Sequence, residues 1–145
     1  ADDAAPREFD DSDSLLSVKK YFDKQNFANA EKTARIVLRD APRFDDVRIL
    51  LARSLLAQGK TAEAEREFRA VLDEKLPTAR SLAWANQGLG EIALRTNRNA
   101  EAARFFEEAI KADAEYGATL AARTARNKAN VAAAIDESVR QFFAQ

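Results

Sequence analysis

Residues 62–72 read AEAEREFRAVL and predict the second helix of a helical hairpin. Ala64, Phe68 and Val71 follow one another at spacings of four and three residues, which places them on one face of a helix. Ala64 lies 34 residues after Ala30 and 38 residues before Ala102, so the second interval is the first plus four residues. A period of 34 residues in a helical pattern indicates an array of stacked hairpins. The same face recurs as Ala30, Ala34 and Val37 and again as Ala102, Phe106 and Ala109.

Turn and breaker residues divide the chain into three such hairpins. A turn precedes each second helix, and glycine suits the left-handed conformation in which helices commonly end. Pro42 and Pro77 follow two of the second helices, because proline cannot continue the helical hydrogen bonding. We expect the four additional residues, about 79–82, to lengthen the first helix of the third hairpin by about one turn. The expected turn residues are Gln25, Gly59 and Asn97, and the expected repeats are 11–44, 45–78 and 83–116.

The first residues of the chain do not share the repeat pattern. Residues 1–10 are acidic, and Phe9 is their only large apolar residue, so we expect a disordered tail. Ser12 or Ser14 is then expected to cap the first helix.

The end of the chain also departs from the repeats, because the pattern changes after Tyr116. We expect one long helix at about 117–143, whose first half caps the stack and whose second half has no repeat to cover it. Val139, Phe142 and Phe143 would then be exposed, which predicts self-association, such as a homodimer through the C-terminal helix. Docking under the third repeat and contact with a further domain are alternatives. The apolar face of this helix contains Leu120, Thr124, Asn127, Val131, Ile135, Val139 and Phe142. The expected organisation is a tail at 1–10, a repeat domain at 11–130 and, at 131–145, the end of the capping helix or a linker into a further domain.

Residues 11–116 resemble the tetratricopeptide repeat family. The family has a small residue midway along the first helix, a glycine at the inner turn, then alanine, an aromatic and alanine along the second helix, and a proline near its end. Ala34 replaces the aromatic residue in the first repeat, and Ala114 replaces the proline in the third. The resemblance implies an all-α, right-handed superhelical solenoid of antiparallel helix pairs with a long C-terminal capping helix, acting as a protein–protein interaction scaffold. The residues midway along the first helices are Val18, Ala52 and Gly90.

The composition argues against several classes of function. The 145 residues contain no Cys and no His, which removes thiol nucleophiles, imidazole bases, disulfides and the common zinc ligands. We therefore expect no enzyme, no cofactor and no bound metal. The chain has 23 basic and 24 acidic residues, and this balance does not predict a nucleic-acid partner. No apolar run approaches the roughly 20 residues that span a bilayer, so we expect no membrane insertion.

The first residue of the sequence bears on the cellular compartment in which the protein is found. The chain begins with Ala1 and contains no Met, so we expect either a signal peptide cleaved before Ala1 or a domain cut from a longer protein. The absence of Cys fits the cytosol and the periplasm alike. A cytoplasmic location and a periplasmic or secreted one therefore both stay open.

In stacked hairpins the first helices line a concave groove, and we expect the binding site there. Lys19 and Arg53 occupy equivalent places in consecutive repeats, so two cations should project into one groove and favour a peptide or partner protein of acidic character. Trp84 is the only tryptophan, and Trp and Arg are enriched at binding hot spots. The solvent-facing residues of the groove are expected to be Lys19, Phe22, Asp46, Ile49, Arg53, Trp84, Gln87, Glu91 and Arg95.

Other interpretations of these residues stay open. Lys19 and Arg53 match the family's carboxylate clamp only in part, because its asparagine partners are missing, so binding of a chaperone tail is not implied. The two cations could simply be solvated, with Trp84 packed against the end of the second repeat. The whole chain could also be a structural or oligomerisation segment of a larger protein whose chemistry lies elsewhere. Gly88-Leu89-Gly90 resembles part of a phosphate loop, but it lies in a predicted helix with no preceding strand, so we interpret it as a site of close helix packing.

Overall fold

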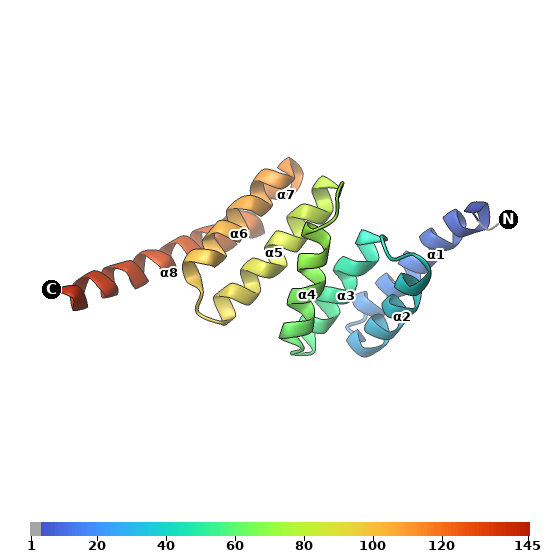
Figure 1. The fold of residues 1–145 in the computed structure, drawn as a ribbon, viewed down its shortest axis with the longest axis horizontal. Coiled ribbons are helices and arrows are strands. Elements are labelled where there is room, and N and C mark those ends of the chain that lie inside the picture. Colours follow the sequence, from blue (N-terminus) through green and yellow to red (C-terminus); the bar gives the residue numbers. More distant parts are fainter. Residues whose placement is uncertain (1–3) are drawn as a thin grey trace. The chain divides into compact units, whose positions relative to one another are not determined.

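The computed structural model describes residues 4–145, with side chains from residue 13 onward, and its regular structure in that range is helical (Figure 1). This confirms the predicted all-α fold. The chain divides into two compact units, Ala1–Asp73 with α1 to α4 and Glu74–Gln145 with α5 to α8. The helices are α1 (Ala4–Asp23), α2 (Phe27–Asp40), α3 (Asp45–Ala57), α4 (Thr61–Leu72), α5 (Ala79–Arg95), α6 (Asn99–Ala112), α7 (Ala114–Gly117) and α8 (Leu120–Ala144).

The first unit consists of two helical hairpins that share a core. α1 pairs with α2 and α3 pairs with α4, and α3 also packs against both helices of the first hairpin. Ala64, Phe68 and Val71 of α4 have no exposed surface, which confirms the inward face expected from the sequence. Val18 and Ala52, the residues expected midway along the first helices, are fully buried as well. Small side chains at these places allow the helices to approach closely, and the aromatic ring fills the remaining space.

The three inner turns have the same backbone geometry. Gln25, Gly59 and Asn97 adopt φ angles of 59°, 80° and 60°, which confirms the expected turn positions. Each turn is a Schellman motif, in which the N–H after the left-handed residue bonds a carbonyl five residues earlier. Only glycine adopts this conformation without the penalty of about 1–2 kcal/mol that a Cβ atom brings. The bonds join Asn26 N to Tyr21 O at 2.9 Å, Lys60 N to Leu55 O at 2.9 Å and Arg98 N to Ala93 O at 2.8 Å.

The second unit is built on the hairpin of α5 and α6, with α7 and α8 packed against α6. α5 has 17 residues and α3 has 13, so the four inserted residues lengthen this first helix as expected. Thr78 caps α5, because its hydroxyl oxygen accepts the N–H of Ser81 at 3.0 Å. A Cβ atom at Gly90 would lie only 2.7 Å from the ring of Phe106. Gly90 therefore serves close helix packing, as the sequence suggests.

The long C-terminal helix is confirmed, but it begins three residues later than expected. α7 is a separate short turn, and Thr119 then caps α8 by accepting the N–H of Ala122 at 3.1 Å. A Cβ atom at Gly117 would lie 2.7 Å from the carbonyl oxygen of Ile110, so glycine allows α7 to close onto α6. The helical periodicity of the sequence runs through this break and does not reveal it.

The face of α8 that packs against α6 is not its large apolar face. Ala122 and Ala129 are buried, and Ala129 belongs to the core of the unit together with Phe106. Leu120 is 80 % exposed and Ile135 is 57 % exposed. α8 therefore caps the hairpin with alanines, because small side chains allow the closest approach to α6.

The first helix is longer than the sequence suggests. α1 begins at Ala4, so the expected start at Ser12 or Ser14 is wrong. Pro6 does not prevent this earlier start, because it lies in the first turn, where backbone N–H groups have no acceptor within the helix. Residues 1–3 of the expected disordered tail lie outside the described residues, and the domain boundaries at residues 10 and 130 stay predictions.

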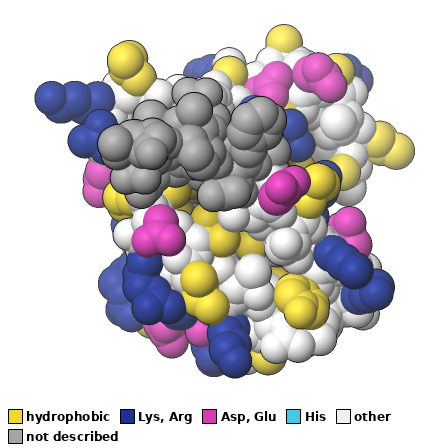
Figure 2. Space-filling view, turned by 90° about the vertical axis from the view of Figure 1, so that its right-hand side faces the viewer, with side chains coloured by type: hydrophobic (Ala, Val, Ile, Leu, Met, Phe, Trp, Pro, Cys, Tyr) yellow, Lys and Arg dark blue, Asp and Glu magenta, His cyan; other side chains and the backbone are white. Residues whose placement is uncertain are grey.

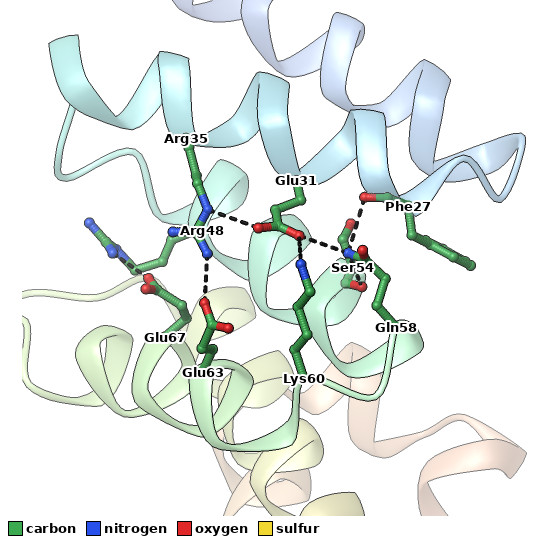
Figure 3. A network of polar contacts seen from close by, with 9 residues as sticks. All are labelled: Phe27, Glu31, Arg35, Arg48, Ser54, Gln58, Lys60, Glu63 and Glu67. Atoms are coloured by element: carbon green, nitrogen blue, oxygen red, sulfur yellow. Dashed lines mark hydrogen bonds and ion pairs between the residues drawn. The ribbon is translucent and has the colours of Figure 1, made fainter.

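A polar network joins α2 to the second hairpin of the first unit (Figure 3). Glu31 of α2 accepts hydrogen bonds from Lys60 Nζ and Gln58 Nε2, both at 2.9 Å, and from Arg35 Nε at 3.0 Å. Arg35 also pairs with Glu63 of α4 at 3.0 Å. Burial alone raises the pKa of Glu31, but the bonds from Lys60, Gln58 and Arg35 outweigh burial and bring that pKa below its ordinary value of 4.5. The charged carboxylate therefore stabilises the packing of the two hairpins.

Replacement of this carboxylate is expected to lower stability at neutral pH. We expect Glu31→Gln to reduce the free energy of unfolding by about 1–2 kcal/mol at pH 7, because three donors lose a charged acceptor. The folded-state pKa is lowered, so this contribution is fully present above pH 4.5 and is lost as the pH falls through the folded-state value. Urea unfolding of both proteins at pH 7 and at about pH 3 measures the difference, which should shrink in acid. Glu108→Gln, at an exposed pair with Lys111, is the matched control and should have little effect at either pH. A gap between Glu31→Gln and the parent protein that widens in acid would contradict the assigned role of Glu31.

Candidate functional site

The groove residues predicted for the first unit lie on α1 and α3, which pack against each other. Phe22 of α1 is at the centre of this surface. Its ring stands edge-on to Phe27 of α2, with centroids 5.4 Å apart and planes at 71°. The guanidinium carbon of Arg53 lies 4.6 Å from the centroid of Phe22. This cation–π contact, worth about 0.5–2 kcal/mol, holds Arg53 over an aromatic pair.

The other three predicted residues of the first unit differ in their exposure to solvent. Lys19 is exposed and precedes Phe22 by three residues, so both lie on the same face of α1. Asp46 is exposed in the first turn of α3. Ile49 is only 5 % exposed, so its assignment to a solvent-facing groove is wrong. α3 packs against α1, α2 and α4, and this enclosure leaves Ile49 in the core. We define the α1–α3 patch as Lys19, Phe22, Asp46 and Arg53.

The predicted residues of the second unit all lie on α5. Trp84 is half-buried, and its ring centroid is 5.8 Å from that of Tyr116 on α7, with the planes tilted by 59°. One turn and two turns further along α5 come Gln87 and Glu91, and Gln87 Nε2 donates to Glu91 Oε1. Arg95 lies one turn beyond, with its Nη2 3.9 Å from Glu91 Oε2. We define the α5–α7 patch as Trp84, Gln87, Glu91, Arg95 and Tyr116.

The pKa of Tyr116 is raised in this patch. Its burial, together with the negative charge of Glu91, raises the pKa of Tyr116 to about 12. The hydroxyl therefore keeps its proton at physiological pH and can donate a hydrogen bond. Beside the indole of Trp84, this surface offers a large apolar ring, a hydroxyl donor and a carboxylate. Such a mixture suits contact with a polypeptide, because Trp and Tyr combine an apolar body with a polar edge.

Tyr116 is a site residue that the repeat pattern does not indicate. It lies in the single turn α7, which the sequence pattern merges with the following helix. The local signal is Gly117, whose missing side chain lets α7 approach Ile110. A glycine directly after an aromatic residue does not by itself predict this contact, because the partner Trp84 is 32 residues earlier in the chain.

Basic and acidic side chains are mixed on the described surface. Figure 2 shows Lys and Arg around much of the edge of one face, with Asp and Glu among them and hydrophobic side chains both at the rim and nearer the middle. Several of the charges pair locally, such as Arg48 with Glu67 at 2.6 Å and Arg69 with Glu65 at 3.0 Å. A nucleic-acid partner requires a continuous basic surface, and the face in Figure 2 does not favour one.

A third feature, a polar pocket, lies between α6 and α8 in the second unit. Its side chains bond one another, with Asn99 Nδ2 donating to Asp136 Oδ2 at 2.8 Å and Arg98 Nη1 lying 3.2 Å from Glu101 Oε1. We assign no ligand to this pocket. In the described part of the chain, no three His, Cys, Asp or Glu side chains are grouped to hold a metal ion. None of the described helices combines the length and the apolar character needed to cross a membrane.

Comparison with known families accounts for the repeated hairpins. The family model described as "Tetratricopeptide repeat" matches residues 15–81 and again residues 50–118, each match covering two consecutive hairpins. Together the two matches cover more than two thirds of the chain. No curated protein matches the sequence. The left-handed inner turns, the buried Ala64 and Phe68 and the two overlapping matches agree with one another, and the chain belongs to the tetratricopeptide repeat family.

Proposed function

We propose that this chain binds a partner protein through exposed residues of its first helices, with the α1–α3 patch of the first unit receiving a peptide segment of acidic character and the α5–α7 patch of the second unit as a separate contact surface. Tetratricopeptide repeats are generally protein–protein interaction modules and are typically non-catalytic scaffolds. The proposal assigns contact to the α1–α3 patch and the α5–α7 patch. Ile49 is left out, because a core side chain cannot meet a partner.

The position of Arg53 over Phe22 is the observation that carries this proposal. An arginine held against a ring has lost part of its conformational freedom before binding, so it loses less on contact with a partner. A guanidinium recognises a carboxylate through paired N–H donors, and Lys19 on the same face of α1 adds a second positive charge. The exposed part of the Phe22 and Phe27 pair supplies apolar contact beside these charges. A partner segment with a carboxylate next to an apolar side chain fits this patch.

The test begins with identification of the partner, by affinity capture with the whole chain followed by mass spectrometry. The affinity of the purified partner is then measured by calorimetry for Arg53→Glu and for Trp84→Ala. We expect each variant to bind at least about tenfold more weakly, as for residues at the centre of an interface. Arg66→Glu is the matched control, because it makes the same charge change at an exposed position of the second helix α4 and should keep the parent affinity.

The proposal fails if both Arg53→Glu and Trp84→Ala bind the partner as tightly as the parent chain. A loss confined to Trp84→Ala would reject the role of the α1–α3 patch and the acidic character of the partner. Far-ultraviolet circular dichroism of each variant establishes that the helices are intact.

A second candidate function is that of an oligomerisation segment. The observation that favours it is the exposed apolar side of α8, where Phe142 is 69 % exposed and Phe143 is 79 % exposed. This surface lies on a different helix from the residues proposed to bind a peptide, so the two functions are compatible.

A further inference from the structure

We propose that two copies of this chain associate through the apolar side of α8, with the two helices antiparallel and centred near residue 137. The apolar stripe consists of Val131, Ile135, Val139 and Phe142, with Phe143 at its edge. At 3.6 residues per turn the first four lie within about 80° of one another around the helix. They are 50–69 % exposed, and Phe142 stands edge-on to Phe143 with ring centroids 5.3 Å apart.

The apolar stripe lies on the side of α8 that faces away from α6. In each complete hairpin the first helix packs against its own second helix, as α3 does with α4 and α5 with α6. α8 packs against α6 through Ala122 and Ala129, and thus occupies the place of a further first helix. The stripe lies on the opposite side of α8, where a second helix would pack in a complete repeat. We therefore expect the stripe to pack against an amphipathic helix that has an apolar stripe of similar length.

The exposed area is sufficient for a dimer of modest affinity. A packed phenylalanine buries about 150–250 Å², so the exposed parts of Phe142 and Phe143 offer about 200–350 Å² per copy. The three aliphatic side chains add roughly 100–200 Å². Two copies together bury about 600–1,100 Å², and specific interfaces begin near 1,000 Å². This range predicts a concentration-dependent dimer and not a permanent one.

Side-chain volumes favour the antiparallel arrangement. With the centre near residue 137, Val131 of one copy lies opposite Phe143 of the other, and Ile135 lies opposite Val139. Each large side chain then meets a smaller one, so the two stripes fill the space evenly. A parallel pair would place Phe142 against Phe142 at one end and Val131 against Val131 at the other, which leaves the aliphatic end underpacked.

Charges favour the same arrangement and a second copy as the occupant. Lys128 lies seven residues before Ile135 and therefore on the side of the stripe, so a parallel pair would bring the two Lys128 side chains close together. The antiparallel pair instead directs Lys128 toward the C-terminal end of the other α8, which carries the negative end of the helix dipole. In the second half, Glu137 already bonds Arg140 and Asp136 already accepts a bond from Asn99. The stripe itself contains no charge, so no oppositely charged partner is required.

The first test is the mass of the full chain in solution, measured by sedimentation at several concentrations. We expect the mass to rise from 16.1 kDa toward twice that value as the concentration increases. Ile135→Glu should remain at the mass of one chain over the same range, because it places a charge in the stripe. Asn130→Glu, with the same charge on another side of α8, should associate like the parent. Phe142→Ala provides a neutral second variant and should shift the association to higher concentration.

Three results would overturn the proposal. One is a parent chain that stays at the mass of one copy at every concentration. Another is association that Ile135→Glu does not reduce although circular dichroism shows intact helices. The third is binding of α8 to anionic lipid vesicles by a chain that does not self-associate. Arg53→Glu, the variant that tests peptide binding, should leave the mass unchanged, so the two proposals fail separately.

A distance measurement tests the antiparallel register. The sequence contains no Cys, so Thr124→Cys provides a single site for a spin label. Residue 124 lies 13 residues before the centre, so two labels in the antiparallel dimer are separated along the helices by about 39 Å at 1.5 Å per residue. A parallel pair would bring the labels to roughly 10 Å, the distance between packed helices, and would overturn the register.

Discussion

Phe68→Ala and Phe106→Ala are each expected to lower the free energy of unfolding by about 3–5 kcal/mol. Both side chains fill the space between helices and are at most 1 % exposed. Truncation removes most of a buried ring and leaves a cavity that neighbouring helices can only partly close. A loss of this size is a large part of the stability of a small domain.

The two substitutions test the two units separately. Phe68 lies in the core of the first unit and Phe106 in the core of the second, so each substitution reports on the packing of its own unit. We expect both Phe68→Ala and Phe106→Ala to lower the melting temperature. Thermal unfolding followed by circular dichroism measures both. Leu76→Ala is the control, because Leu76 is 93 % exposed and its truncation should leave the melting temperature nearly unchanged. An unchanged melting temperature in Phe68→Ala would contradict the packing described for α4.

Gly90→Ala is expected to destabilise the chain by about 1–3 kcal/mol, which is the usual result of overfilling a packed core. The new methyl group would lie 2.7 Å from the Phe106 ring, and a ring that is 1 % exposed has no free space to enter. The sign of the change in stability distinguishes the effect of this contact from the effect of helix propensity. Alanine is the better helix former by about 0.8–1.0 kcal/mol, so a helix without this contact would become more stable.

A double-mutant cycle isolates the contact between Gly90 and Phe106. Phe106→Leu provides a smaller side chain beside residue 90, so Gly90→Ala should be less harmful in that background. We expect a coupling of about 0.5–3 kcal/mol between the two positions, measured by urea unfolding of the four proteins. Additive effects, or a more stable Gly90→Ala single variant, would show that Gly90 is not a close crossing point of α5 and α6.

Much of the fold follows from periodicity alone. The 34-residue recurrence around Ala64 predicts the hairpins, and the burial of Ala64, Phe68 and Val71 confirms their inward face. The four inserted residues lengthen α5 because no breaker residue separates them from the rest of that helix. These features are local, since each depends on residues within one helix or one turn.

The sequence was less informative where one helix meets another. The burial of Ile49 depends on three neighbours of α3, and a helical projection of α3 alone places this residue on the solvent side. The break between α7 and α8 depends on the approach of Gly117 to Ile110. The contact between Trp84 and Tyr116 is a consequence of that break, so Tyr116 could not be assigned to the site beforehand.

By itself, the sequence determined that this protein is an all-helical array of tetratricopeptide repeats with inner turns at Gln25, Gly59 and Asn97. It also determined which face of α4 is buried, because periodicity and turn chemistry act within a few residues. Only the tertiary structure decided which side of α8 packs against α6. Both sides of α8 are apolar enough to be buried, and the alanine side packs because small side chains allow the closest approach to α6. The larger apolar side, with Ile135 at its middle, is left exposed for that reason.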